Sequence, residues 1–311
     1  MKTIFEYISS NKEKLTEDNF NPVDSLVLAR LSYLPMHKII NTNEKMKLKK
    51  LLNILKCFRD EFFVDVANDK KFVNFLSKSN RFLDLELSDC VESVSKDESK
   101  QFGALVIDLG FSKYISFKGT DRSFVGIKED LDMSYKNIPA QKEALKYFNN
   151  IAKKYDNSRF ILGGHSKGGN IAIYAGIYTD DKNRNRIKSI YNFDGPGFLD
   201  EVLEEEGYNK ILNKIYTILP TSSFIGLLLK RKEKVKFVNS DNFFVMQHDV
   251  FSWHVSGKDF SYTTNQTKIS KTASKSIKKL QESISSKEKE ALIESINEIP
   301  SIISKIKNRK R

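Results

Sequence analysis

The sequence contains few cysteines and histidines and no long run of apolar residues. Among its 311 residues are only two cysteines, Cys57 and Cys90, and four histidines. Two cysteines provide neither a disulfide framework nor a metal-ligand pattern, so we expect reduced thiols and no metal or other cofactor. The apolar runs in 224–229 are too short to cross a bilayer, and the first residues lack the apolar region of a signal peptide. We therefore expect a cytoplasmic protein.

Acidic residues are outnumbered by basic ones, and the imbalance is uneven along the chain. There are 52 Lys or Arg against 40 Asp or Glu, a net charge of +12. Residues 261–311 hold 12 Lys or Arg and five Glu, a net of +7. No recognised nucleic-acid module accompanies this charge, so we expect no nucleic-acid partner. The simplest interpretation is a solvated surface, and the alternative is contact between the basic tail and an anionic membrane.

The spacing of apolar residues differs between the first 80 residues and the rest of the chain. Apolar residues recur at helical spacing early in the sequence, whereas strand-like stretches appear from about residue 82 and then alternate with helical ones. We expect helices at 24–34, 43–58, 72–76, 141–155, 170–178, 199–213 and 223–229. We expect strands at 83–87, 90–94, 104–107, 114–117, 160–162, 187–193, 215–219, 235–239 and 251–255.

This alternation favours an α/β fold, in which helices cover both faces of a mostly parallel sheet. Three parts are predicted: a helical N-terminal region (1–80) that packs on the core, an α/β core (81–260), and a basic helical tail rich in serine and lysine (261–311). In such sheets, sites lie at the carboxyl ends of the strands. Residues that directly follow a predicted strand are therefore the candidates for chemistry.

Residues 164–168 carry a G-x-S-x-G pattern with Ser166 at its centre. An apolar strand-like run precedes the pattern and a helix-like run follows it, which is the order that a nucleophile elbow needs. The glycines matter because the strand and helix backbones pass close to each other at such a turn. We predict that Ser166 is a nucleophile at the carboxyl end of its strand.

A serine nucleophile needs a base, usually histidine. His37 lies in the helical N-terminal region and is predicted to be structural, and His165 lies inside the elbow with its side chain directed away from the serine. His248 and His254 both follow the last predicted parallel strand, in the order serine, acid, histidine. His248 sits in a polar loop, whereas His254 falls in the predicted strand 251–255. We therefore favour His248 as the base and keep His254 as the alternative.

Asp194 is the favoured acid because it directly follows the strand 187–193 and opens a Gly-Pro-Gly turn. A carboxylate there would hold the histidine tautomer and stabilise the imidazolium. The same position also suits an aspartate that only forms a turn. Asp249 and Asp241 are weaker candidates.

Two backbone N–H groups are candidates for an oxyanion hole, which acyl transfer requires. One belongs to Lys167, directly after the nucleophile at the start of a helix. The other belongs to Thr120, in the loop 117–121 that follows an earlier strand. The alternative for this loop is an ordinary turn that ends a strand.

Taken together, these segments resemble the α/β-hydrolase superfamily and, within it, the class 3 lipases, through residues 115–120 and 164–169. A closer similarity is to uncharacterised bacterial lipase-like hydrolases, domain of unknown function 2974, in residues 117–121, 164–170, 192–197, 219–226 and 247–249 with Trp253. The resemblance covers roughly residues 20–260. It implies an α/β-hydrolase fold, hydrolysis of an ester or lipid substrate, and a contribution of Thr120 to the oxyanion hole.

The chain departs from the class 3 lipases at one point. They carry their acid after the strand that here is 215–219, but residues 220–223 read Pro-Thr-Ser-Ser and contain no carboxylate. Either Asp194 supplies the acid from the preceding strand, or a hydroxyl orients the base, or Ser166 and His248 act unaided. We expect a serine hydrolase of carboxylic esters that forms an acyl-enzyme on Ser166. The alternative is a non-catalytic binding module on a hydrolase scaffold.

Overall fold

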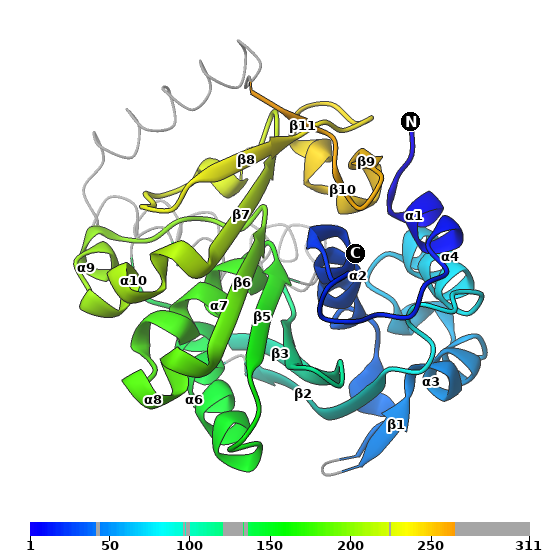
Figure 1. Cartoon of the computed structure of the whole chain (residues 1–311), viewed down its shortest axis with the longest axis horizontal. Helices are drawn as coiled ribbons and strands as arrows, with labels where there is room; N and C mark the ends of the chain where they lie inside the picture. The colour runs from blue at the N-terminus through cyan, green and yellow to red at the C-terminus, as the bar shows by residue number, and fades with distance from the viewer. Residues whose placement is uncertain are drawn as a thin grey trace, which may run out of the picture.

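A nine-stranded sheet forms the centre of the described chain (Figure 1). The computed structural model describes residues 1–41, 44–95, 97, 100–120, 133, 136–223 and 225–264. The strands, in their order across the sheet, are β1 (Lys45–Lys47), β2 (Glu86–Ser95), β3 (Lys100–Asp108), β4 (Lys113–Phe117), β5 (Phe160–His165), β6 (Ile187–Phe193), β7 (Ile215–Pro220), β8 (Val235–Val238) and β11 (Tyr262–Thr263). A separate hairpin pairs β9 (Val255–Ser256) with β10 (Asp259–Phe260).

The five strands from β4 to β8 run parallel to one another. Antiparallel pairing joins β1 to β2, β2 to β3, β3 to β4, and β11 to β8. The central strand β5 is buried along its whole length, as expected for a parallel strand covered on both faces. The structure confirms the predicted α/β-hydrolase fold with a mostly parallel sheet. Because β4 to β8 are parallel, the loops that follow them meet at one edge of the sheet.

Helices cover both faces of the sheet, as Figure 1 shows. One face packs against the N-terminal helices α1 (Ile4–Ser10), α2 (Pro22–Leu31), α3 (Leu48–Leu55) and α4 (Val66–Leu76). The other packs mainly against α6 (Pro139–Lys154), α7 (Lys167–Tyr178) and α10 (Glu206–Ile211), near α8 (Asp181–Arg186) and α9 (Asp200–Leu203). Short 3-10 turns complete the description at η1 (Met36–Lys38), η2 (Asp60–Phe62), η3 (Leu212–Lys214), η4 (Ile225–Leu227), η5 (Phe244–His248) and η6 (Val250–Ser252).

Helix α2 is buried on every side from Val23 to Leu31. Its polar side chains therefore need partners inside the protein, because a buried polar group without one is costly. Ser25 Oγ lies 2.9 Å from the Tyr114 hydroxyl on β4, and Arg30 Nη2 donates to Asp69 Oδ1 at 2.9 Å. These contacts tie α2 both to the sheet and to helix α4.

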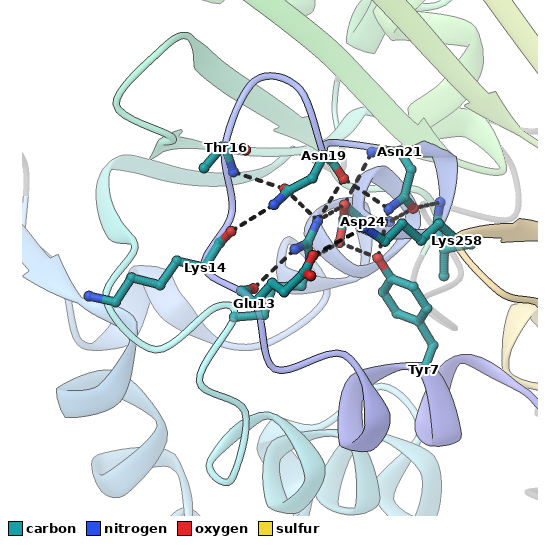
Figure 2. A network of polar contacts seen from close by, with 10 residues as sticks. Tyr7, Glu13, Lys14, Thr16, Asn19, Asn21, Asp24 and Lys258 are labelled. Atoms are coloured by element: carbon teal, nitrogen blue, oxygen red, sulfur yellow. Dashed lines mark hydrogen bonds and ion pairs between the residues drawn. The ribbon is translucent and has the colours of Figure 1, made fainter.

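Asp24 of α2 and Arg81 form an ion pair whose side chains are both fully buried. Arg81 Nε donates to Asp24 Oδ1 at 2.7 Å and Nη2 donates to Oδ2 at 2.6 Å, a two-pronged contact. The Tyr7 hydroxyl of α1 donates to the same carboxylate at 2.7 Å. Figure 2 shows Tyr7, Asn19 and Asn21 grouped around Asp24. The network therefore joins α1, the start of α2 and the segment before β2.

Several predicted elements have different bounds. The predicted helix 43–58 begins with strand β1, because residues 45–47 pair with β2, and α3 starts only at Leu48. The predicted strands 83–87 and 90–94 merge into β2, with a bulge between Ser88 and Val91. Both differences arise from backbone pairing with a neighbouring strand, and such pairing cannot be read from the local spacing of apolar residues.

Three further predictions were wrong in element type or continuity. The predicted strand 251–255 begins with the turn η6, because Asp249 accepts a hydrogen bond from the backbone of Phe251, and only Val255 joins a strand. The predicted helix 223–229 is reduced to the 3-10 turn η4. The predicted helix 199–213 is divided into α9, α10 and η3.

The predicted division of the chain into residues 1–80, 81–260 and 261–311 stays a prediction. The side chains of α1 to α4 share one apolar cluster with Trp253 and Phe260, so the described parts of 1–80 and 81–260 pack as neighbours. Of the basic tail, only residues 261–264 are described, and the rest lies outside the described residues. Among the helices that the structure describes, none is long and apolar enough to cross a membrane.

The buried pair predicts a large effect on stability. Replacing Arg81 by Met should lower the free energy of unfolding by about 3–5 kcal/mol, because it leaves the Asp24 carboxylate buried without its cation. Urea unfolding measures this difference. The matched control is Lys14→Met, which removes a pair with Asp84 whose side chains are 80% and 65% exposed and screened by water. Equal losses in the two variants would contradict the prediction.

Candidate active site

Ser166 lies at the junction of β5 and α7 in a backbone conformation that non-glycine residues rarely adopt. Its φ is 59° and its ψ is −134°, and it is 7% exposed. The turn is possible because the neighbouring glycines let three backbone segments approach. A Cβ on Gly164 would lie 2.3 Å from the carbonyl carbon of Gly168, and a Cβ on Gly168 would lie 2.3 Å from the Phe117 carbonyl oxygen. This is the geometry of a nucleophile elbow.

Positive φ angles occur at Ser166 and at two residues near it, and also at Asp89 in the bulge of β2. Among the described residues, four non-glycine residues have positive φ: Asp89, Ser166, Asp194 and Leu229. Asp194 has a φ of 54° and directly follows β6, the strand beside β5. Leu229 lines the same pocket as Ser166. Each such conformation costs about 1–3 kcal/mol, and these costs cluster at functional sites.

The structure brings Asp194 and His248 within hydrogen-bond distance. His248 Nδ1 lies 2.7 Å from Asp194 Oδ2. A carboxylate oxygen only accepts, so Nδ1 carries the proton and Nε2 keeps a lone pair that can accept one. The Asp194 side chain is 1% exposed, whereas that of His248 is 30% exposed. The pair therefore joins a buried acid to a partly accessible imidazole with a defined tautomer.

Contacts from distant parts of the chain hold the loop that carries His248. The indole of Trp253 donates to the Gln247 carbonyl at 2.8 Å, and the Gln247 side chain accepts from the Ser222 backbone at 2.8 Å. His165 Nε2 lies 2.9 Å from the His248 carbonyl, and the two imidazole rings are 4.5 Å apart. The elbow itself therefore contributes a support for the loop.

His165 is a buried histidine that stays uncharged. A carbonyl only accepts, so Nε2 donates to the His248 carbonyl. Nδ1 lies 3.1 Å from the Tyr33 hydroxyl, which also donates to the His165 carbonyl at 3.2 Å. Burial, followed by the nearby His248 and Arg30, holds the pKa of His165 well below its usual value. Its side chain contacts the loop of His248, and the expectation that it turns away from the serine stays a prediction.

Lys167 directly follows Ser166, and Thr120 follows Gly119 in the loop after β4. The loop after β4 passes the elbow closely, because a Cβ on Gly119 would lie 2.4 Å from the His165 carbonyl oxygen. Lys167 is the first residue of α7, where the helix dipole favours negative charge. Its side chain is buried, and Nζ donates to the backbone and side-chain oxygens of Gln101 at 2.7 and 2.8 Å.

The alternative candidates have other partners. His254 Nε2 lies 2.6 Å from Asp241 Oδ1, so the alternative base and one weaker acid pair with each other. Asp249 accepts from the Phe251 backbone at 3.0 Å, and burial raises its pKa. His37 lies in η1, with Nδ1 3.6 Å from Glu92. In the described ranges, no three His, Cys, Asp or Glu side chains gather as a metal site.

Ser223 is a residue of the site that the sequence reasoning did not single out. Its hydroxyl donates to Asp194 Oδ1, the oxygen that His248 does not use. A mostly apolar pocket beside Ser166 was also not predicted, and its lining includes Met133, Lys167, Pro196, Ile225, Leu228 and Leu229. The one sequence signal for Ser223 was the absence of a carboxylate at 220–223, because it left open that a hydroxyl from this segment helps to orient the base.

Comparison with known proteins adds a family match. The sequence model of the Mbeg1-like family matches residues 76–298. This range contains the elbow, the Asp194 turn and the His248 loop. No curated protein matches the sequence.

Among solved structures, several lipases match the chain at low identity and low TM-score. The Lip2 lipase of Yarrowia lipolytica is 11% identical, with 74% of this chain and 92% of that chain covered and a TM-score of 0.41. The Rhizomucor miehei lipase in complex with its propeptide is 14% identical, with 76% and 81% covered and a TM-score of 0.40. A triacylglycerol lipase with a serine protease triad is 12% identical, with 74% and 83% covered and a TM-score of 0.43.

The lowered pKa of His165 predicts a pH-dependent loss of stability. The folded protein keeps His165 neutral, whereas the unfolded chain takes up a proton below about pH 6.5. The free energy of unfolding should therefore fall as the pH drops from 7 to 5, by up to about 1.4 kcal/mol per pH unit from this residue. Urea unfolding of wild type and His165→Gln at each pH measures the difference. A parallel pH dependence in both proteins would refute this role of His165.

Proposed function

The chain belongs to the Mbeg1-like family, and from this premise we propose that it is a lipase-like or esterase-like serine hydrolase that cleaves carboxylic esters. The observation that carries the proposal is the 2.7 Å contact between His248 Nδ1 and the buried carboxylate of Asp194. This contact leaves Nε2 as the basic nitrogen, at the sheet edge where Ser166 forms a nucleophile elbow. An acid, a base and a nucleophile are the groups that acyl transfer to serine needs.

In the proposed reaction, Ser166 Oγ attacks the ester carbonyl carbon while His248 Nε2 takes the hydroxyl proton. The imidazolium then gives this proton to the leaving alkoxide, and an acyl-enzyme remains on Ser166. A water molecule attacks the acyl carbon in the same way and releases the carboxylic acid. The backbone N–H groups of Thr120 and Lys167 stabilise the oxyanion in both steps. Asp194 keeps the tautomer of His248 and offsets its positive charge.

The apolar pocket beside Ser166 suits the acyl group of the substrate. Leu228, Leu229 and Ile225 contribute its aliphatic wall, and Pro196 lies in the turn that Asp194 opens. Binding of an alkyl chain there would remove apolar surface from water, which is worth about 0.8 kcal/mol per methylene. We therefore propose an ester or lipid with an aliphatic acyl chain as the substrate.

Three finer expectations stay predictions beside this proposal. They are the closer similarity to domain of unknown function 2974, a cytoplasmic location, and contact between the basic tail and an anionic membrane. The tail lies outside the described residues, apart from 261–264. The alternative of a non-catalytic binding module makes the opposite prediction for the experiment below.

Covalent labelling tests the nucleophile and the base. A fluorophosphonate probe should label the wild type but not Ser166→Ala, since the probe reacts only with an activated serine. His248→Gln and Asp194→Asn should lower kcat/KM for a short p-nitrophenyl ester by about 10⁴-fold, because the base or its tautomer is lost. Gel fluorescence and initial rates measure the two effects.

The matched control for the base is His254→Gln, which alters the other histidine of the same region and should keep both labelling and turnover. Loss of labelling in His254→Gln with retention in His248→Gln would reassign the base. A folded wild type that is neither labelled nor active would support the binding-module alternative and end the hydrolase proposal.

Leu228 should affect which acyl chains are accepted. Leu228→Trp fills the pocket and should exclude long acyl chains. We compare kcat/KM for an eight-carbon p-nitrophenyl ester with kcat/KM for a two-carbon ester. Their ratio should fall about ten-fold or more, in line with the energy of a few methylene contacts. The control Leu228→Met nearly conserves volume and should keep the ratio. A ratio unchanged by Leu228→Trp would place the acyl chain elsewhere.

A further inference from the structure

The two carboxylate oxygens of Asp194 have different partners. Oδ2 lies 2.7 Å from His248 Nδ1, and Oδ1 accepts a hydrogen bond from the Ser223 hydroxyl. Asp194 is fully buried and Ser223 is 5% exposed. Neither oxygen is therefore left to bulk water, and the rotation of the carboxylate about its own axis is limited from both sides.

The direction of the Ser223 hydrogen bond is set by its surroundings. The backbone N–H of Gly226 donates to Ser223 Oγ at 2.9 Å, so the hydroxyl proton is directed to Asp194. The chain at Gly226 passes close to both residues, because a Cβ there would lie 2.5 Å from Asp194 Oδ1 and 2.7 Å from Ser223 Oγ. Ser223 is therefore a donor in a tightly packed position.

Arg231 ties the turn of Asp194 to the loop of Ser223. Its Nη2 donates to the Gly195 carbonyl at 3.1 Å and also to the Gly226 carbonyl. Its Nη1 lies 3.5 Å from Glu233, whose side chain is 1% exposed. The segment after β6 and the segment after β7 are thus held at a fixed separation by one guanidinium group.

We propose that Ser223 is a positioning residue that orients the Asp194 carboxylate toward His248 through its hydrogen bond to Oδ1. The inference rests on the proposed function, in which Asp194 is the acid of the site. The acid lies directly after β6, and the segment after β7 contributes the Ser223 hydroxyl in place of a carboxylate. Without this donor, the carboxylate is free to turn, and the Nδ1–H tautomer of His248 is no longer the only one favoured.

The test reads the tautomer of His248 directly. Nitrogen-15 spectra of histidine-labelled protein resolve the ring nitrogens of the four histidines, and His248→Gln assigns its signals. The wild type should show the Nδ1–H tautomer, and Ser223→Ala should show a substantial fraction of the Nε2–H tautomer. The kcat/KM for a short p-nitrophenyl ester should fall about ten-fold, mainly in kcat, which corresponds to about 1.4 kcal/mol.

Three further variants separate positioning from packing. Ser223→Thr keeps the hydroxyl and should restore the Nδ1–H tautomer. Ser223→Cys keeps a side chain of similar size with only a weak donor, so it should show the same increase in the Nε2–H tautomer as Ser223→Ala. It takes the place of Ser223→Ala if the alanine variant does not fold. Ser222→Ala alters the neighbouring serine, whose backbone N–H still donates to Gln247, and should match the wild type.

Two outcomes would overturn the proposal. One is a wild-type tautomer in folded Ser223→Ala or Ser223→Cys, and the other is an equal change in Ser222→Ala. The spectra need no turnover, so they decide the role of Ser223 even for a wild type that cleaves no ester. Such inactivity would count against the proposed function alone.

Discussion

The site depends on the close approach of three backbone segments at the elbow. Strand β5, the first turn of α7 and the loop after β4 meet where Gly164, Gly168 and Gly119 have no side chain. Any Cβ at these positions would overlap a backbone atom, so the contact requires glycine. Ser166 has a positive φ at this contact, and the loop that leads to Thr120 is packed against the elbow at Gly119.

The N-terminal helices support this arrangement from one face of the sheet. Helix α2 is buried from Val23 to Leu31, and three of its polar side chains contact Arg81, Tyr114 and Asp69. The Tyr33 hydroxyl, which follows α2, contacts His165, and His165 contacts the His248 carbonyl. A chain of neutral hydrogen bonds therefore leads from the N-terminal region to the proposed base, and it remains neutral because burial disfavours the charged form of His165.

Local patterns were sufficient for the fold class, and they indicated Ser166, Asp194 and His248 as the candidates for the site. Each of the three follows a strand that could be predicted, and parallel strands end at one edge. Local patterns failed where pairing or packing decided the element. Residues 45–47 pair with β2, and in 251–255 the Asp249 side chain accepts from the Phe251 backbone and favours a turn. Ser223 could not be selected because serine is common in turns, and its role appears only through the oxygen of Asp194 that it reaches.

By itself, the sequence determined most of the alternation of strands and helices and the steric demand for glycine around Ser166, because both are properties of neighbouring residues. It also excluded a disulfide framework through its two cysteines. Only the tertiary structure decided that Asp194, and not Asp249 or Asp241, faces His248, since side chains 54 residues apart meet there. It likewise paired His254 with Asp241 and placed Ser223 on the acid. These choices depend on the separation of loops at the sheet edge, which packing sets and local sequence does not.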